Sequence, residues 1–140
     1  MTDLVVDASV AIKWVIDEPG THQALSLRCN RLYAPDLLVA ECANVLWKKV
    51  QRNELTAPEA LIAARLLQRA DLELMPMRAL LEPATRLAIE LGHPAYDCIY
   101  LALAESMTCD LVTADRELAA KPLPAGHDFR VLALAGSDFP

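Results

Sequence analysis

Leu4-Val5-Val6-Asp7-Ala8-Ser9 is the stretch that decides the fold. A short apolar, β-branched run ends at an aspartate, and the helical pattern of residues 10–15 follows directly, so the stretch predicts strand, turn and helix. The same alternation continues along the chain. Further strands are predicted at 31–34, 72–77, 110–113 and 131–133, and helices at 21–30, 37–52, 57–70, 78–91, 95–107 and 116–120. Strands that alternate with helices predict an α/β fold with a parallel sheet covered on both faces.

The composition is that of one globular domain. The chain has 140 residues, of which 54% are hydrophobic, and it carries no repeat or low-complexity linker, so we expect a single domain over residues 1–140. The first residues are acidic, and no apolar run approaches the ~20 residues of a membrane span, so we expect a soluble cytoplasmic protein with no membrane association. The four cysteines are scattered and predict free thiols, and neither they nor the three histidines form a zinc motif.

The net charge is −6, which argues against binding polyanions through counterion release alone. A nucleic acid would therefore have to bind locally or through a metal ion. An acidic chain is equally suited to a basic segment of a partner protein.

Four acidic residues stand where the pattern predicts apolar or edge positions. Asp7 and Asp115 directly follow predicted strands, and the carboxyl ends of parallel strands meet at one edge of the sheet. Glu41 shares a helical stripe with apolar residues such as Leu38, and Asp97 lies on the stripe of Tyr100. No basic residue nearby in the sequence relieves Glu41 or Asp97, and burying a lone carboxylate costs several kcal/mol.

A divalent cation would remove the repulsion among these four carboxylates. Oxygen-only ligands favour Mg²⁺ or Mn²⁺, and such an ion supports attack of water on a phosphodiester. Each acid also has a structural alternative. Asp7 and Asp115 could cap the helices that follow them, and Asp97 could interact with a helix dipole. Glu41 has the weakest structural explanation.

Neighbouring polar residues are candidate accessory groups. Ser9 and Thr113 could orient a ligand carboxylate or contact metal-bound water, and Ser9 could instead cap a helix. Arg116, beside Asp115, is the best candidate for a contact with RNA phosphate. The other basic residues with that alternative are better explained as a solvated helix face: Lys13, Lys48, Lys49 and Arg52.

Four segments in order carry a resemblance to a known family. They are Val5-Val6-Asp7-Ala8-Ser9-Val10-Ala11, Pro35-Asp36-Leu37-Leu38-Val39-Ala40-Glu41, His93-Pro94-Ala95-Tyr96-Asp97 with Leu101-Ala102, and Leu111-Val112-Thr113-Ala114-Asp115. Together they resemble the PIN-domain ribonucleases, and specifically the VapC toxins of bacterial toxin–antitoxin modules. Residues 121–140 match little that is diagnostic of the family.

The resemblance implies an α/β/α sandwich with a mostly parallel sheet of four to five strands. It also implies an endoribonuclease that depends on Mg²⁺ or Mn²⁺, forms a homodimer and is held inactive by a cognate antitoxin. Carried over by position, Asp7 and Asp97 become direct metal ligands. Glu41 and Asp115 complete the shell, through water or directly, and one of them helps to deprotonate the nucleophile. Ser9 and Thr113 become accessory groups.

Two alternatives stay open. A phosphatase of the haloacid-dehalogenase type uses an aspartate after the first strand as nucleophile, but it needs a second aspartate where this chain has Ser9. A non-catalytic domain could keep the PIN fold only to bind a partner. The complete set of four acids favours the nuclease.

Overall fold

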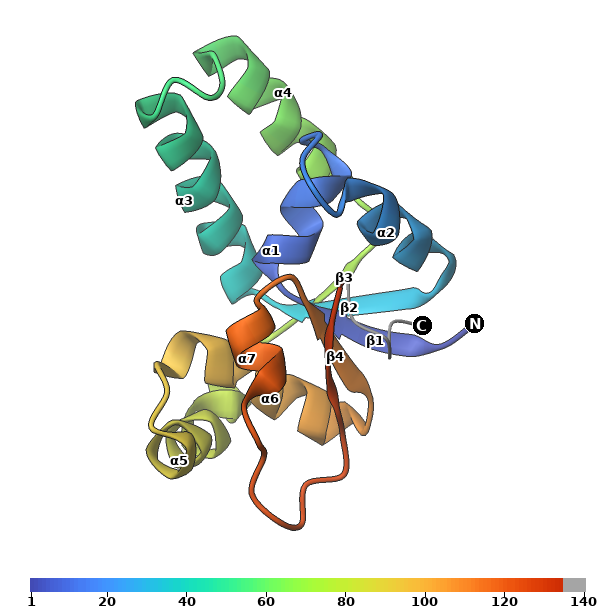
Figure 1. Ribbon diagram of the computed structural model, residues 1–140, viewed down its shortest axis with the longest axis vertical. Coiled ribbons are helices and arrows are strands. Elements are labelled where there is room, and N and C mark those ends of the chain that lie inside the picture. Colours follow the sequence, from blue (N-terminus) through green and yellow to red (C-terminus); the bar gives the residue numbers. More distant parts are fainter. Residues whose placement is uncertain (135–140) are drawn as a thin grey trace.

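A five-stranded parallel sheet forms the centre of the protein (Figure 1). The computed structural model describes residues 1–134. The strands lie in the order β3-β2-β1-β4-β5, and each neighbouring pair is parallel. Their bounds are β1 Asp3–Val6, β2 Arg31–Pro35, β3 Glu73–Met75, β4 Asp110–Thr113 and β5 Val131–Ala133. The predicted sheet is confirmed, and within the described residues it has five strands and no antiparallel pair.

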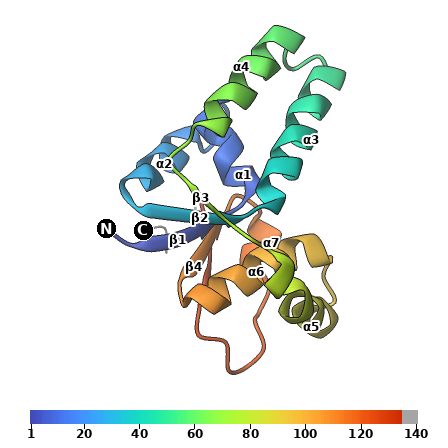
Figure 2. The same ribbon diagram turned by 180° about the vertical axis from the view of Figure 1, so that it is seen from behind.

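Helices connect the strands and cover both faces. The α-helices are α1 Ala8–Ala11, α2 Thr21–Ser26, α3 Leu37–Gln51, α4 Ala57–Gln68, α5 Leu81–Leu91, α6 Ala95–Met107 and α7 Arg116–Ala120. Short 3₁₀ turns extend three of these segments, at η1 Ile12–Trp14, η2 Leu27–Cys29 and η3 Arg78–Leu80. Figure 2 shows α1 to α4 on one side of the sheet and α5 and α6 on the other. This arrangement is the predicted α/β/α sandwich.

The alternation of side chains along β1 divides the core between the two faces. Leu4 and Val6 pack with α1 and α2, while Val5 packs in the larger cluster that contains Leu101 of α6. Successive residues of a strand point to opposite faces, so one short apolar strand supplies both cores. The central position of β1 explains why its three apolar residues, Leu4 to Val6, are almost fully buried.

Local chemistry sets several helix ends. The Thr56 hydroxyl accepts a hydrogen bond from the Glu59 amide, and the Glu59 carboxylate accepts one from the Thr56 amide, so the predicted capping box starts α4. Gly92 ends α5 with a φ of 60°, a left-handed conformation that glycine adopts without strain. These two ends agree with the sequence prediction.

Two predicted helix starts differ. The first helix begins at Ala8 and changes into a 3₁₀ turn at Ile12, and its cap is Asp7 and not Ser9. Thr21 begins α2 but does not cap it, because its hydroxyl donates to the Ile16 carbonyl. In both places the hydroxyl is held by a partner that local helix rules do not identify.

The chain order of the strands reverses between β1 and β4. The connection from β1 leads outward through β2 to β3, and β4 then returns to the other side of β1. In open α/β sheets, sites form outside the carboxyl ends of the strands at such a switch point.

Over residues 1–134, no helix is long and apolar enough to cross a membrane.

Candidate metal-binding active site

Asp7 lies at the carboxyl end of β1, beside the end of β4. Val6 pairs with Val112 in the parallel ladder, so the next residues, Asp7 and Thr113, lie side by side. The Thr113 hydroxyl donates a hydrogen bond of 2.5 Å to Asp7 Oδ2, and the Ser9 hydroxyl donates one of 2.5 Å to Oδ1. Both oxygens of a buried carboxylate are thereby fixed by hydroxyl groups from two segments of the chain.

The same two hydroxyls are themselves held by the backbone after β4. The Ala114 amide donates to Ser9 Oγ at 2.9 Å, and the Asp115 amide donates to Thr113 Oγ1 at 3.1 Å. Each hydroxyl therefore donates to Asp7 and accepts from an amide. Ser9 and Thr113 thus orient the carboxylate, which is one of the two roles predicted for them; the capping role predicted for Ser9 belongs to Asp7.

Burial makes Asp7 an unusual acid. The residue is only 7% exposed, and this desolvation raises the pKa of Asp7 to about 6. The hydrogen bonds from Ser9, Thr113 and the Val10 amide lower the pKa of Asp7, and the negative charge of Asp97 raises it. A strongly shifted pKa at a sheet switch point is typical of a functional carboxylate.

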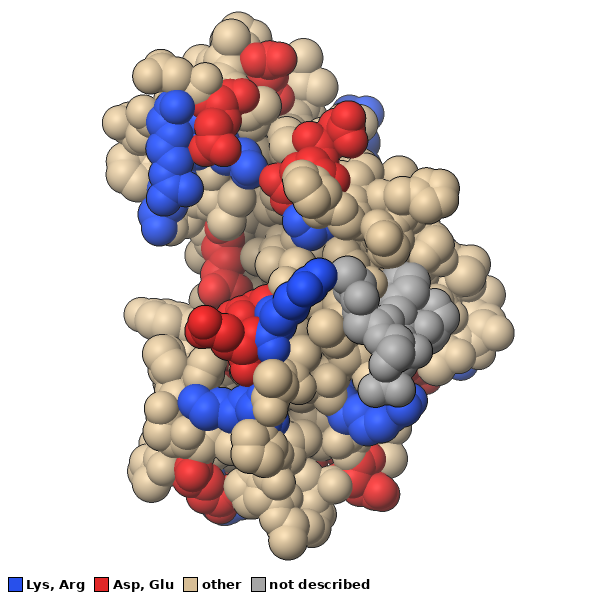
Figure 3. Space-filling view, viewed as in Figure 1, with Lys and Arg blue, Asp and Glu red and all other residues tan. Residues whose placement is uncertain are grey.

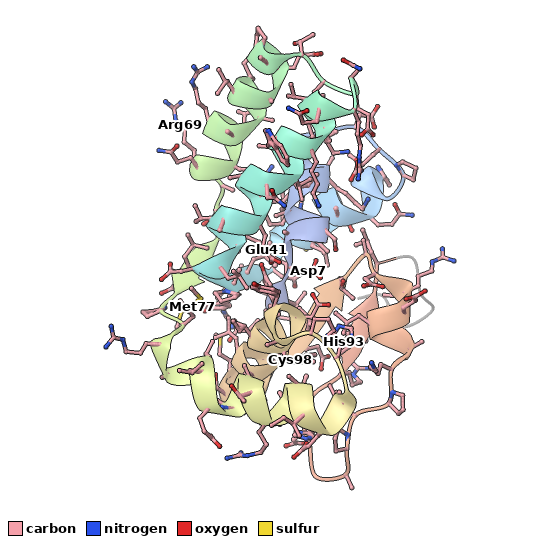
Figure 4. The ribbon with its side chains drawn as sticks, turned by 90° about the vertical axis from the view of Figure 1, so that its left-hand side faces the viewer. Asp7, Glu41, Arg69, Met77, His93 and Cys98 are labelled. Carbon is pink, nitrogen blue, oxygen red and sulfur yellow. The ribbon has the colours of Figure 1, made fainter. Side chains whose placement is uncertain are left out.

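Glu41 lies near the start of α3, close to Asp7 at the centre of the molecule (Figure 4). Burial raises the pKa of Glu41, and the charge of Asp97 raises it further, while the nearby Tyr100 hydroxyl lowers it. The pKa of Tyr100 is raised in turn by burial and by the charges of Glu41 and Asp7. The charge of Asp97 therefore acts on both Asp7 and Glu41, which places these three predicted acids in one electrostatic environment.

The Tyr100 hydroxyl was not predicted as part of this site. Tyr100 is 1% exposed, and its buried hydroxyl interacts with the Glu41 carboxylate, although within residues 1–134 it has no hydrogen-bond partner of good geometry. The sequence placed Tyr100 on an apolar helical stripe, and that position is correct for its ring. Only the fold shows that its polar end reaches the acids.

Asp97, in the first turn of α6, has a basic neighbour. His93 Nε2 lies 2.6 Å from Asp97 Oδ2, so the expectation that no basic residue relieves Asp97 is wrong. His93 stands four residues before Asp97, a separation that brings two side chains together across a helix start. That spacing is the signal that sequence reasoning missed.

Asp115 and Arg116 occupy the beginning of α7. Asp115 Oδ1 accepts hydrogen bonds from the amides of Glu117 at 3.0 Å and Leu118 at 3.2 Å, so Asp115 caps this helix. Both Asp115 and Arg116 are exposed. The capping alternative for Asp115 is therefore real, and a role in metal binding stays a prediction for this residue.

The donors at this edge of the sheet suit a hard divalent cation. Carboxylate oxygens predominate, and the charge of Asp97 raises the pKa of both Asp7 and Glu41. In residues 1–134, no three His, Cys, Asp or Glu side chains gather closely enough to enclose an ion. Mg²⁺ keeps several waters and is commonly bound through one or two carboxylates, so the donor set fits a hydrated ion. Figure 3 shows acidic side chains beside basic ones at the hollowed waist of the molecule.

Known proteins share this sequence pattern. The PIN domain family matches residues 4–122. Ribonuclease VapC9 of Mycobacterium tuberculosis is 34% identical over 116 residues, which cover 83% of this chain and 88% of the relative. Ribonuclease VapC3 of Pyrobaculum aerophilum is also 34% identical, over 125 residues that cover 84% of this chain and 93% of the relative.

Solved structures share the fold. The crystal structure of PAE2754 from Pyrobaculum aerophilum has a TM-score of 0.66 and 27% identity, and the match covers 93% of this chain and 83% of that one. A VapBC-5 toxin–antitoxin structure from Mycobacterium tuberculosis matches with a TM-score of 0.61 at 20% identity, over 95% and 99% of the two chains. The resemblance found in the sequence is confirmed. The chain belongs to the PIN-domain family, and within it to the VapC ribonucleases.

Proposed function

We propose that residues 1–140 form a single nuclease domain, which hydrolyses RNA phosphodiester bonds internally as the toxin of a toxin–antitoxin pair. The observation that carries this proposal is the buried Asp7 carboxylate, whose pKa is raised to about 6 and whose charge interacts with Asp97 at the sheet switch point. Burial disfavours the ionised form of such a carboxylate, because the charge loses its hydration and no positive group in the described part of the chain replaces the water. A cation site explains that arrangement better than a purely structural role.

The acids divide into two groups. Asp7 and Asp97 are the proposed direct ligands of Mg²⁺ or Mn²⁺, and Glu41 and Asp115 complete the shell, through water or directly. When bound, the ion would activate a water molecule and neutralise charge on the phosphate oxygens. Burial raises the pKa of Glu41, so this residue is the better candidate to accept a proton from the attacking water.

The remaining polar groups orient the acids and the substrate. Ser9 and Thr113 fix the plane of the Asp7 carboxylate through their two hydrogen bonds of 2.5 Å. The exposed Arg116 guanidinium, next in the chain to Asp115, is the proposed contact for an RNA phosphate. Because the net charge is −6, RNA would be held by local contacts of this kind.

A protein partner is part of the proposal. Apolar side chains of α4 are more than half exposed, namely Leu61, Ile62 and Leu66, and exposed apolar groups of this kind mark interaction surfaces. The curated relatives are named VapC ribonucleases, and several structural neighbours are VapBC toxin–antitoxin complexes. We assign a cognate antitoxin and a second copy of this chain as partners.

All four cysteines are free thiols, which suits a cytoplasmic protein.

The test is cleavage of total cellular RNA by the purified chain. Cleavage is expected with Mg²⁺ or Mn²⁺ and not with chelator, and Asp97→Asn should abolish it without unfolding the protein. Asp36→Asn is the matched control, because Asp36 is exposed and its side chain makes no capping bond. Cleavage that persists in chelator would contradict the metal role.

The same experiment tests the non-catalytic alternative. A PIN-fold domain that only binds a partner would show no metal-dependent cleavage in any of these samples. Expression of the chain alone should arrest growth, and Asp7→Ala should relieve the arrest. Equal arrest by both versions would reject the proposed mechanism. The phosphatase alternative finds no support in the family to which the chain belongs.

A further inference from the structure

His93 lies between a site acid and a lysine from a distant part of the chain. Its Nε2 atom is 2.6 Å from Asp97 Oδ2, and its Nδ1 atom is 3.2 Å from Lys121 Nζ. His93 follows Gly92 in the connection between α5 and α6, Asp97 belongs to the first turn of α6, and Lys121 is the residue that ends α7. Three segments thus meet at the imidazole ring of His93, which is labelled in Figure 4.

The direction of these hydrogen bonds follows from the chemistry of the groups. A lysine ammonium has three donors and no acceptor, so Nδ1 of His93 must accept the bond from Lys121. The ring hydrogen then stands on Nε2, which donates to Asp97 Oδ2. Lys121 therefore selects the tautomer that His93 needs to donate to the acid.

Fixing one oxygen of a carboxylate also fixes the other. A bond at Oδ2 restricts rotation of the Asp97 side chain and so sets the direction in which its Oδ1 atom presents lone pairs. The His93 side chain is only 16% exposed, so water competes weakly for this bond. Partners of this kind, which hold a ligating carboxylate, typically change metal affinity 10- to 100-fold when they are removed.

We propose that His93, held in one tautomer by Lys121, is a positioning residue that orients Asp97 toward a divalent ion. This inference rests on the proposed function, in which Asp97 is a metal ligand. It gives Lys121 a role although residues 121–140 carry no diagnostic motif. His93 itself touches neither the ion nor the RNA, and acts only through Asp97.

The test measures Mn²⁺ binding to the whole chain without RNA, by electron paramagnetic resonance or calorimetry. His93→Leu keeps the bulk and removes the donor, and it should weaken Mn²⁺ binding by about 10-fold or more. His93→Gln can still donate to Asp97 and accept from Lys121, so it should restore most of the affinity. Affinity equal to wild type in His93→Leu would overturn the inference.

His127 supplies a matched control. Its ring also contacts carboxylates, Glu105 through Nδ1 and Glu90 through Nε2 at 3.7 Å, and its side chain is also 16% exposed. It comes from the loop before β5 and touches no site acid. His127→Leu should leave Mn²⁺ affinity unchanged, and an equal loss there would mean that any loosening of this region affects the site.

A measurement on the wild-type protein keeps the inference testable if His93→Leu does not fold. Nitrogen-15 NMR of the His93 ring should show the hydrogen on Nε2, and a hydrogen on Nδ1 would refute the proposed direction of the bonds. The proposed function fails separately. Wild type that binds Mn²⁺ without cleaving RNA contradicts the nuclease alone, whereas wild type that does not bind Mn²⁺ contradicts both.

Discussion

Asp7→Asn is expected to stabilise the metal-free protein at neutral pH while it removes the activity. Asn has nearly the shape of the ionised carboxylate but no charge. In the wild type, the ionised Asp7 is buried at 7% exposure, and the hydrogen bonds from Ser9 and Thr113 offset only part of the lost hydration. The substitution therefore separates the cost of the charge from the geometry of the site.

The size of the effect follows from the pKa of Asp7, which burial raises from 3.8 to about 6. The native state binds the Asp7 proton more tightly than the unfolded state does. The protonated carboxyl therefore stabilises the native state fully below pH 3.8, and this stabilisation is lost as the pH rises through 6. The ionised form costs about 3 kcal/mol at pH 7 and about half of that at pH 5. The Asn side chain lowers the free energy of unfolding by roughly 1 kcal/mol, because its amide nitrogen cannot accept the hydrogen bond that Thr113 donates.

The expected result is a variant about 2 kcal/mol more stable than wild type at pH 7 and less than about 1 kcal/mol more stable at pH 5. Urea unfolding in chelator measures both values, with fluorescence of Trp14, whose indole donates to the Ala24 carbonyl at 2.8 Å, as a probe of the native state. Added Mn²⁺ should stabilise wild type and leave the variant unchanged. A variant no more stable than wild type at pH 7 would show that the ionised Asp7 carboxylate does not destabilise the native state, which would refute the expected effect.

Three further substitutions test separate parts of the structure. Thr113→Val removes a hydrogen bond that lowers the pKa of Asp7, so the acidic limb of the pH profile of RNA cleavage should move to higher pH, and Thr113→Ser should restore it. An unmoved limb would contradict the assignment of that limb to Asp7. Tyr100→Phe removes the hydroxyl that lowers the pKa of Glu41, so the protein should lose about 1 kcal/mol of stability at pH 7 in urea unfolding; unchanged stability would contradict the interaction of the two groups. Thr56→Ala breaks the capping box of α4 and should cost about 1 kcal/mol while RNA cleavage stays unchanged, and lost cleavage would contradict the separation of α4 from the site.

The parts of the fold that could be predicted are those with local determinants. Three elements have the predicted bounds, because a local signal marks each one. A proline precedes the helix Ala95–Met107, an apolar run forms the strand Asp110–Thr113, and a capping acid precedes the helix Arg116–Ala120. The helix after Asp7 was harder. Asp7 caps it and also belongs to the site, and the helix tightens into a 3₁₀ turn at Ile12 that periodicity does not reveal.

The site could be predicted only as far as single residues conflict with their surroundings. Asp7, Glu41 and Asp97 stood out as acids on apolar or edge positions. In the structure, burial and the charge of Asp97 raise the pKa values of Asp7 and Glu41. Lys121 did not stand out, because it meets His93 across 28 residues of sequence and looks like an ordinary surface lysine. Contacts of this kind depend on the packing of α7 against the rest of the fold.

The hydroxyl network and the charge at Asp7 solve two different problems. Ser9 and Thr113 fix where the carboxylate oxygens lie, and the backbone amides of Ala114 and Asp115 fix the hydroxyls. None of these neutral donors cancels the charge, which is why burial still raises the pKa of Asp7 to about 6. A rigid site that stays electrostatically unsatisfied gains more from a divalent cation than a flexible one, since no ordering has to accompany binding. The cost of burying the ionised Asp7 carboxylate is therefore linked to cation binding at the site. Removing this charge should make the protein more stable and, at the same time, inactive.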